Sequence, residues 1–569
     1  MSDSGHGSVG TREQQFTELL PLRKKAYLPS LLFDLAARMK SAPDGVHEGP
    51  DPEENLWVPA GYTYFGQFVD HDLTFDNTSS LNPADDGAKG RFPTNLRTPR
   101  FDLDSLYGDG PDAQPFLYGG DGASLLFKDG DVNSVGTTGQ FSGQAPQDLL
   151  RSPNGRAMIG DKRNDENVLI GQIQLLFVRY HNAVVKTLAA ADPALTGTLL
   201  FERARQEVRW TYQTLVVEDF LPRIVRADVQ QNLKDAASPD ERAHRYALYT
   251  HDKRGNLPRE FVVAAYRYGH SGVRQGYQMN AGTMLDIFAG SDKDPGEPSL
   301  LGFKPLPKTL VIDDFGRFFP GTPPSPPTDT IPPRVANVPN TILQYAYKLD
   351  TNIVDPLGAL PLNILPTSDT KGGIFAEIED AIAPETLPLT RQPVPPSPHE
   401  RPSLALLNLL RGNTYKVQSG QEIARVLRSK GLHQAATLTS DQLSVRVGRK
   451  DAANSNIFRY EPICSTSLAL EEDTPLWFYI LAEAQAPLVD HFGTGIENEF
   501  PEDHMLNGIG ARTQLGWVGG RIIAEVFYGL LDADDESFVN AAPTGWRPLL
   551  GGNGSPIFLN VVKFVEEQA

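Results

Sequence analysis

The most constraining feature of this chain is a long apolar pattern with helical spacing at residues 166–193, ENVLIGQIQLLFVRYHNAVVKTLAAADP. Its apolar side chains return every three or four residues, which places them on one stripe of an α-helix. The stripe consists of Leu169, Ile170, Ile173, Leu176, Phe177, Val184 and Leu188. Strand patterns are few and short. The sequence therefore predicts a mainly α fold, with further helical patterns at 16–42 (interrupted by prolines), 201–232, 403–412, 420–429, 475–488 and 517–531.

The organisation of the chain follows from its length and from its proline content. With 569 residues, length alone favours several sub-cores or two to three domains. Residues 1–15 predict a flexible tail, and residues 76–160, rich in Gly, Asp, Asn, Ser and Pro, predict mainly ordered loop. Two Pro-rich stretches, near 304–337 and 384–403, predict extended connections because proline fixes φ and lacks an amide donor.

Composition excludes several classes of protein. The formal net charge of −19 argues against unaided binding to nucleic acid or anionic membranes and favours cations. Cys464 is the only cysteine, so neither an internal disulfide nor a Cys-x-x-Cys-His haem attachment is available. The N-terminal residues lack a Sec signal pattern, and we find no apolar run of the roughly 18–20 residues that span a bilayer. We therefore expect a protein without a membrane span, either cytoplasmic or secreted by a route without a Sec signal peptide.

The segment GYTYFGQFVDHDLTFD, at residues 61–76, sets polar residues inside an apolar stretch. If it is helical, Gln67 and His71 share one face and Asp70 borders that face. Asp72 is turned about 100° from His71 and points elsewhere. Such a helix presents Gln, His and one Asp to a pocket and a second carboxylate to another site. The alternative is a surface turn or a satisfied polar cluster.

The segment RTPRFDLDSLYGDG, at residues 97–110, contains oxygen-bearing side chains at alternate positions. Thr98, Asp102 and Asp104 offer the hydroxyl and carboxylate oxygens that hard cations such as Ca²⁺ prefer. An EF-hand fits poorly, because Tyr107 and Ala113 occupy the positions of its required glycine and closing glutamate. An Asp-rich surface turn is the alternative.

Three later segments complete the set of candidate residues. In MIGDKRNDENVLIGQ, Arg163 and Glu166 come at the start of the long helical pattern, where a carboxylate also suits the positive helix end. In FVVAAYRYGHSGV, an apolar run leads to His270, whose neutral imidazole could ligate iron if another group holds its second nitrogen. In LALLNLLRGN, Asn408 is followed by Arg411. Taken singly, these residues also fit a helix cap with a surface arginine and a buried, hydrogen-bonded histidine.

The order of these five segments resembles the animal-type haem peroxidases of the peroxidase–cyclooxygenase superfamily, in particular the bacterial members. The matching motifs here are GQFVDHD, TPRFDLDSLYG, GDKRNDE, RYGH and LNLLR. The similarity covers roughly residues 20–535. It implies one large haem peroxidase domain over residues 16–569, with haem b between distal and proximal helices.

The resemblance also implies roles for individual residues. On the distal side His71, Arg163 and Gln67 would be catalytic. On the proximal side His270 would ligate the iron and Asn408 would accept its Nδ1–H. The residues implied to pair with the haem propionates are Arg267 and Arg411, and those at the ester-forming positions are Asp70 and Glu166.

The calcium positions of the family fall on Asp72, Thr98, Asp102 and Asp104, with the backbone carbonyl of Arg100. Two residues depart from the family pattern. Asn167 stands where a methionine forms a sulfonium link in myeloperoxidase, so such a link is not expected. Asp104 replaces Ser or Thr, so that either three carboxylates tighten calcium binding or Ser105 competes as a ligand.

The implied activity is reduction of hydrogen peroxide through an oxyferryl intermediate, followed by oxidation of halide, thiocyanate or small aromatic donors. His71 would act as general base and then general acid, and Arg163 would stabilise the developing charge. One alternative is a fatty-acid dioxygenase of the same superfamily using a tyrosyl radical, for which Tyr345 and Tyr347 are candidates. The second alternative is a non-enzymatic, calcium-binding scaffold. The sequence leaves the oligomeric state open.

Overall fold

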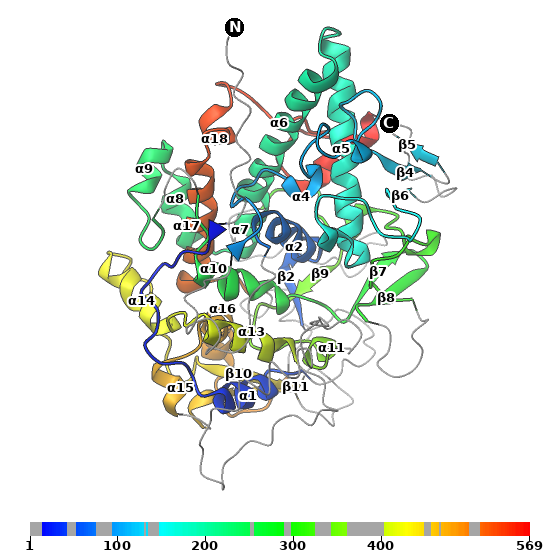
Figure 1. Ribbon diagram of the computed structural model, residues 1–569. Helices are drawn as coiled ribbons and strands as arrows, with labels where there is room; N and C mark the ends of the chain where they lie inside the picture. The colour runs from blue at the N-terminus through cyan, green and yellow to red at the C-terminus, as the bar shows by residue number, and fades with distance from the viewer. Residues whose placement is uncertain are drawn as a thin grey trace.

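The computed structural model describes most of the chain, and Figure 1 shows the arrangement of its elements. The described residues are 14–41, 53–75, 94–129, 132–134, 147–250, 255–288, 298–324, 343–360, 403–448, 457–465, 468–499 and 512–568. Helices dominate them, as the sequence predicts. Buried apolar side chains form one large cluster that extends from Phe16 to Val565.

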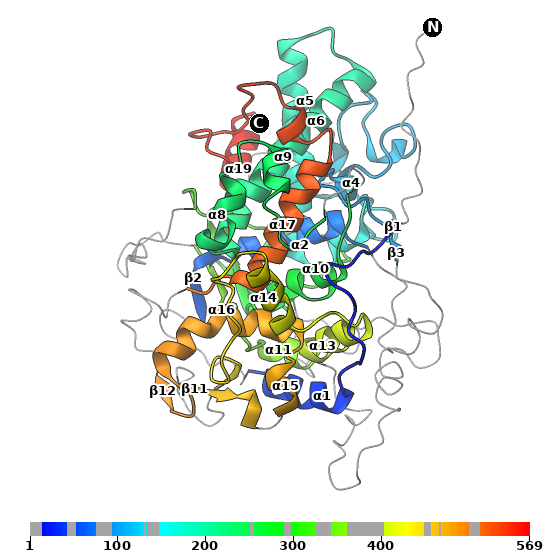
Figure 2. The same cartoon turned by 90° about the vertical axis from the view of Figure 1, so that its left-hand side faces the viewer.

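The helices divide between the two ends of the molecule. In both views, α5 and α6 rise at one end, α1, α13 and α15 lie at the other, and α2 lies between them (Figures 1 and 2). The longer helices are α1 (Pro29–Arg38), α2 (Gly61–Leu73), α5 (Val168–Ala191), α6 (Gly197–Leu215), α8 (Ala227–Lys234), α13 (Leu404–Thr414), α14 (Gly420–Ser429), α16 (Leu476–Phe492), α17 (Trp517–Ala533) and α19 (Phe558–Glu567). The short helical segments are α4 (Asp104–Tyr107), α7 (Leu221–Ile224), α9 (Pro239–Ala243), α10 (Arg259–Val263), α11 (Asp355–Gly358), α15 (Leu468–Glu472), α18 (Phe538–Ala541), η1 (Pro115–Leu117), η2 (Lys162–Asp165), η3 (Val216–Phe220), η4 (Ala265–His270), η5 (Lys308–Leu310), η6 (Phe315–Arg317) and η8 (Ile463–Ser465).

The strands form small antiparallel pairs and triplets between and around the helices. The ordered strands are β1 (Gln14–Gln15) with β3 (Thr94–Asn95), β2 (Glu54–Pro59) with β9 (Tyr345–Tyr347), β7 (Gly276–Asn280) with β8 (Thr283–Asp286), β4 (Phe127–Asp129) between β5 (Val132–Ser134) and β6 (Gln147–Leu149), and β11 (Ile457–Pro462) between β10 (Ser444–Gly448) and β12 (Asn498–Glu499). The flexible tail predicted for residues 1–15 includes two residues that belong to a strand, because residues 14–15 pair with residues 94–95.

The long helix α5 is confirmed, and its burial extends beyond the predicted apolar stripe. Every residue from Val168 to Val185 is buried, so the first five turns are covered on all sides. Some polar side chains on those turns bond distant backbone, as when Asn182 bonds the backbone of Leu125 through both its amide atoms. By length and composition α5 could cross a membrane, yet 94% of its most apolar window is buried inside the protein, which is typical of a core helix.

Helix α2 carries the histidine segment through the middle of the core. Its aromatic side chains pack against α5 and α6, with the Phe68 and Phe177 rings 5.0 Å apart and the Phe68 and Tyr212 rings 6.0 Å apart. The helix is otherwise buried, but Thr63, Gln67 and Asp70 are only half-covered. These three residues are spaced four and three apart, so together they form one narrow face of α2 that the protein covers only in part.

Most other helix predictions are confirmed within one to four residues, as α13, α14, α16 and α17 show. Two are too simple. The pattern at 201–232 is divided among α6, a π-helical turn (η3), α7 and α8, and only α1 forms within 16–42. The stretch 76–160 contains short strands and turns besides loop. Residues 325–337 and 384–402 of the Pro-rich stretches lie outside the described residues.

Candidate active site

His71 is buried on α2, and both of its ring nitrogens have defined neighbours. Nδ1 lies 2.8 Å from Asn164 Oδ1, and Nε2 lies 3.9 Å from Glu166 Oε1. Burial, and then the nearby charge of Arg163, lower the His71 pKa to about 3. The ring is therefore neutral near pH 7. With Nδ1–H donated to Asn164, the Nε2 lone pair is available to take a proton.

Asn164 was not among the predicted site residues. It is fully buried, and its Nδ2 donates to Gln174 Oε1 at 2.8 Å. Asn164 thus connects the ring of His71 to the core of α5. No local pattern marks this role, because the partners are 93 residues apart in the chain.

Arg163 lies at the carboxyl end of α2. Its Nη2 donates to the carbonyl of His71 at 3.1 Å and to the carbonyl of Thr74, and its Nε and Nη2 also bond Asp161. The guanidinium further stacks 4.7 Å from the Phe75 ring centre. Arg163 is therefore next to His71, as predicted, and its charge is shared with a neighbouring carboxylate.

Glu166 and Gln67 border the same space. Gln67 Nε2 donates to Glu166 Oε1, and Asn167 Nδ2 donates to Gln67 Oε1 at 3.1 Å. Burial raises the Glu166 pKa to about 7, against the opposing charge of Arg163. The side chain nevertheless keeps 34% of its surface uncovered. Both properties follow if Glu166 faces an internal space surrounded by protein.

Asp70 is the second carboxylate beside this space. Thr74 Oγ1 donates to its Oδ1 at 3.1 Å. Burial raises the pKa of Asp70, while Arg163 and Arg267 oppose that rise. Asp70 and Glu166 come from different segments of the chain. The structure nevertheless places both of these residues, which were predicted to form esters, beside the same space.

His270 lies on η4 and contacts Asn408 on α13. Its Nδ1 lies 2.8 Å from Asn408 Nδ2, so the predicted pair is in contact, although the amide nitrogen rather than the oxygen faces the ring. Arg267 Nη1 donates to the Asn408 oxygen at 3.3 Å, which accounts for this orientation. Iron binding through Nε2 of His270 needs the reverse orientation, which a half-turn of the amide provides. Burial, followed by Arg267, lowers the His270 pKa to about 3.

Open space adjoins this turn. A methyl group added at Gly269 would meet no protein atom within 4 Å, and His270 itself is half-buried. Arg411, one turn beyond Asn408 on α13, is also half-buried. The donor set beside the space, a neutral imidazole with two arginines, fits a haem iron and its carboxylates.

Direct contacts join η4 to α2. Tyr266 Oη donates to the carbonyl of Gly66 at 3.1 Å, and a methyl group at Gly272 would lie 3.5 Å from Thr63 Oγ1. The turn that carries His270 therefore lies beside the half-covered face of α2.

Asp72, Asp102 and Asp104 form a separate cluster. One carboxylate oxygen from each lies within 4.8 Å of the others. Burial raises the pKa of Asp72, and the charges of Asp102 and Asp104 raise it further. Leu103 adopts φ 58°, which turns the chain so that both loop carboxylates reach the same point. Two buried carboxylates and one half-buried carboxylate repel one another, so the cluster suits a cation.

The other predicted calcium residues lie around this cluster. Thr98 Oγ1 donates to Asp102 at 2.7 Å, and Ser105 Oγ donates to Asp72 at 3.3 Å. The side chain of Arg100 points to Asp534, 3.7 Å away, which leaves only its backbone for the cluster. Ser105 thus supports a carboxylate through a hydrogen bond.

Tyr345 and Tyr347, the candidates for the dioxygenase alternative, lie on β9. The Tyr347 ring is 5.2 Å from the Arg274 guanidinium, and its amide donates to the carbonyl of Gly272 at 3.0 Å. Gly272 is two residues beyond His270, so β9 runs beside the proximal turn.

The sequence of the chain matches a known family over the centre of this site. Residues 80–287 match the family model described as animal haem peroxidase. This match covers well under half of the chain, and over these residues the chain is similar to animal haem peroxidases. The matched residues include Arg163, Glu166, His270 and the loop with Asp102 and Asp104, whereas α2 and α13 lie outside them.

Individual curated proteins show the same similarity. The chain is 25% identical over 158 residues to a dual oxidase of Drosophila melanogaster and 28% identical over 120 residues to a chorion peroxidase of the same organism. These segments cover 27% and 21% of this chain, but only 9% and 14% of the two relatives. Among solved structures, peroxidase A from Dictyostelium discoideum shares the fold, with a TM-score of 0.51, 15% identity, and coverage of 93% of this chain and 90% of that chain.

Proposed function

We propose that this chain is a haem peroxidase that reduces hydrogen peroxide and oxidises halide, thiocyanate or small aromatic donors. The observation that carries the proposal is the pair of neutral histidines on adjoining segments. His71 and His270 each have Nδ1 in contact with an asparagine. This contact leaves Nε2 of His71 for chemistry, and a half-turn of the Asn408 amide would do the same for Nε2 of His270. The similarity of residues 80–287 to animal haem peroxidases supports the same activity.

His270 would hold the haem iron, and Arg267 and Arg411 would pair with the propionates. Bound haem would supply the iron and the redox chemistry that cleave the peroxide O–O bond. The open space at Gly269 and the half-covered Gln67 and Asp70 support a ligand between η4 and α2.

The distal residues would move protons and stabilise charge. His71 Nε2 takes a proton from one peroxide oxygen and returns it to the other, first as base and then as acid. Asn164 keeps the ring oriented for both steps. Arg163 places its positive charge beside the departing oxygen. Gln67 and Glu166 supply further hydrogen-bonding groups at the same wall.

The test is to replace His71 with glutamine in the full chain loaded with haem. We expect the Soret band to remain and the rate of reaction with peroxide, followed by stopped flow, to fall by about 10²–10⁴-fold. His181→Gln is the matched control, since His181 is also a buried histidine but bonds Tyr107 and the carbonyl of Ala123. A His71→Gln rate equal to wild type would refute the catalytic assignment.

The same preparation decides between the alternatives. Oxygen consumption with linoleate, and none of the expected donor oxidation, would favour the fatty-acid dioxygenase, for which Tyr347 beside the proximal turn is a candidate. A chain that takes up no haem and shows no Soret band would favour the calcium-binding scaffold.

Calcium is the cation proposed for Asp72, Asp102 and Asp104, with Thr98 and the Arg100 carbonyl completing an oxygen ligand set. The supporting observations are the proximity of the three carboxylates and the raised pKa values of Asp72 and Asp102. Asp72 immediately follows His71, so the cation would brace the helix that carries the proton-transfer residue.

Ester links from Asp70 and Glu166 to haem methyl groups are a further part of the proposal. Each carboxyl group would replace one C–H bond of a methyl group by a C–O bond. This change removes two electrons and two protons, which one hydrogen peroxide takes up to give two water molecules. After peroxide treatment, we expect acid acetone to leave haem on the wild-type chain and to extract more from Glu166→Gln. Complete extraction from the wild-type chain would exclude the links.

A further inference from the structure

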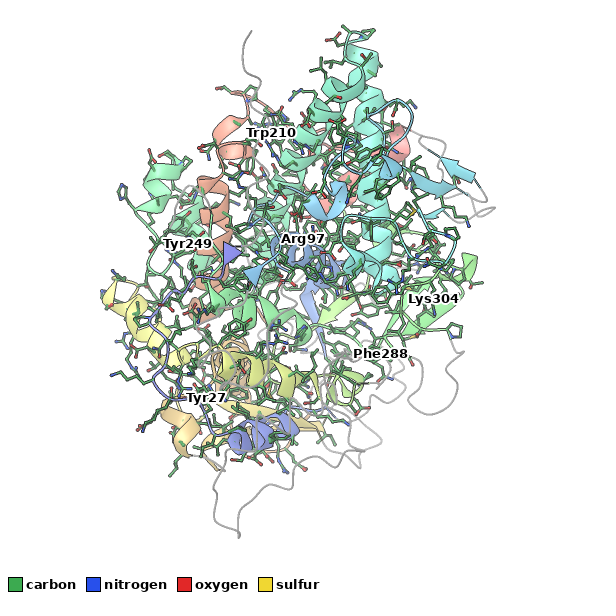
Figure 3. All side chains as sticks on the ribbon, viewed as in Figure 1. Tyr27, Arg97, Trp210, Tyr249, Phe288 and Lys304 are labelled. Atoms are coloured by element: carbon green, nitrogen blue, oxygen red, sulfur yellow. The ribbon has the colours of Figure 1, made fainter. Side chains whose placement is uncertain are left out.

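Arg97 lies between the carboxylate cluster and the segment that carries Arg163, near the centre of the molecule (Figure 3). Its buried guanidinium makes four hydrogen bonds. Nη1 donates to Asp104 Oδ1 at 3.0 Å, and Nε and Nη2 donate to Asp161 Oδ2 at 3.1 and 2.7 Å. The fourth goes from Nη2 to the carbonyl of Gly160 at 3.1 Å. One cation is thus divided between two carboxylates.

Asp161 is divided in the same way between two arginines. Besides Arg97, it binds Arg163 through Nε at 3.1 Å and Nη2 at 2.7 Å, and it accepts the backbone N–H of Arg163 at 2.9 Å. The order Asp104, Arg97, Asp161, Arg163 is an alternating row of charges in the interior. In such a row, a stronger pairing at one contact weakens the next, because each inner group serves two partners.

The backbones of the two segments are also in contact. The amide of Asp161 donates to the carbonyl of Ser105 at 3.0 Å. A methyl group at Gly160 would lie 2.5 Å from the carbonyl oxygen of Asp104, so no larger residue fits without movement. A displacement of the cluster loop therefore reaches the segment with Arg163 directly.

We propose that Arg97 is a positioning residue that links cation occupancy of the cluster to the placement of Arg163. A divalent cation on Asp104 repels the Arg97 guanidinium and competes for the same oxygen atoms. Arg97 then pairs more strongly with Asp161, which loosens the hold of Asp161 on Arg163 and frees that guanidinium for the distal site. The inference rests on the proposed calcium site and on the proposed distal role of Arg163. The proposal also gives a role to Asp104, which replaces the Ser or Thr of the family pattern. Its carboxylate, the third in the cluster, pairs with Arg97.

The test measures calcium affinity of the full chain by isothermal titration calorimetry, for wild type, Arg97→Gln, Arg97→Lys, Arg163→Gln and the double variant Arg97→Gln/Arg163→Gln. We expect Arg97→Gln to tighten calcium binding at least about fivefold, the lower end of typical site coupling. Arg97→Lys keeps the charge and should stay near wild type. Arg163→Gln should tighten binding by a smaller factor, because Asp161 then takes more of Arg97.

The double variant gives the decisive comparison. If Arg97 carries the link, Arg163→Gln has no additional effect once Arg97 is neutral, so the double variant matches Arg97→Gln. Arg242→Gln, which breaks another buried arginine–aspartate pair, controls for general loss of stability in thermal unfolding. Weaker or unchanged calcium binding in Arg97→Gln, or fold-changes that simply multiply in the double variant, would overturn the link.

Failure of the proposed function gives different results. If the wild-type chain binds no calcium and Asp72→Asn changes nothing, the calcium site fails and the link fails with it. If calcium binds as expected but no Soret band forms with haem, the peroxidase proposal fails, while the coupling between Arg97 and Arg163 in calcium affinity still stands.

Discussion

Three histidines among the described residues are held neutral by the same physical condition. Desolvation of the charged ring lowers the pKa values of His71, His270 and His181 to about 3, 3 and 4, although His270 is only half-buried. In the first two, neutrality keeps a nitrogen lone pair for chemistry. In His181, both nitrogens are used in hydrogen bonds that join α5 to Tyr107 and Ala123.

His181 allows a test of this condition away from the site. Its pKa is about 6.5 when unfolded and about 4 when folded. Between these values the unfolded state binds more protons, so stability falls as pH decreases from about 6.5 to 4. We expect His181→Gln to be less stable than wild type at pH 7 but to lose less of its unfolding free energy between pH 7 and pH 4.5. Urea unfolding at both pH values measures this, and equal losses in the two proteins would contradict it.

At the scale of elements, the site depends on where segments approach closely. Gly160 touches the cluster loop, whereas Gly269 faces open space beside His270. A methyl group would therefore clash at Gly160 and meet no protein atom at Gly269. The first glycine marks a packed contact, and the second borders the space proposed for a ligand.

Gly160→Ala should destabilise the protein by about 1–3 kcal/mol, the usual cost of overpacking. Gly269→Ala should leave the unfolding midpoint of the haem-free chain near wild type and weaken haem uptake, since its methyl group enters the proposed haem space. Thermal unfolding and Soret titration measure the two effects. A strongly destabilised Gly269→Ala chain without haem would show that the space is not open.

The regular angle between successive residues of a helix made part of the site predictable from the sequence. Gln67, His71, Asp70 and Asp72 sit on α2 where the 3.6-residue period places them, three toward the site and one toward the cluster. Asn164, Asp161 and Arg97 were not predicted. Their roles arise from pairs 64 and 93 residues apart, and such pairs leave no periodic signal in one sequence.

The burial of α5 on all sides was unpredictable for a related reason. Its apolar stripe is real, but its remaining faces carry Gln172, Gln174 and His181, which normally indicate solvent. Tertiary partners bind several of these groups, as His181 and Gln172 show by bonding distant backbone. Only the folded chain reveals that polar residues of this kind lie in a core.

At the scale of the whole molecule, the carboxylate cluster connects several separate elements. It joins α2, the loop before α4 and, through Arg97, the segment before α5. A cation there would bind only the folded chain, because the three carboxylates meet only after folding. Stability should therefore depend on the concentration of the cation.

Removal of calcium by a chelator should lower the unfolding midpoint of the wild-type chain, and added calcium should restore it. Asp72→Asn should remove most of this dependence, because one of three charges is lost at the site. Differential scanning calorimetry at several calcium concentrations measures the effect. A midpoint independent of calcium in the wild-type chain would count against the cation.

The hydrogen bond from Tyr266 to the carbonyl of Gly66 has a consequence for how the chain is made. The two residues are 200 positions apart, and α5 and α6 lie between them in the sequence. During synthesis, a chain that ends before Tyr266 holds the distal histidine with no opposite wall, however well its first helices have formed. The site is thus completed late, and truncation products ending before residue 266 should neither retain haem nor compete for it.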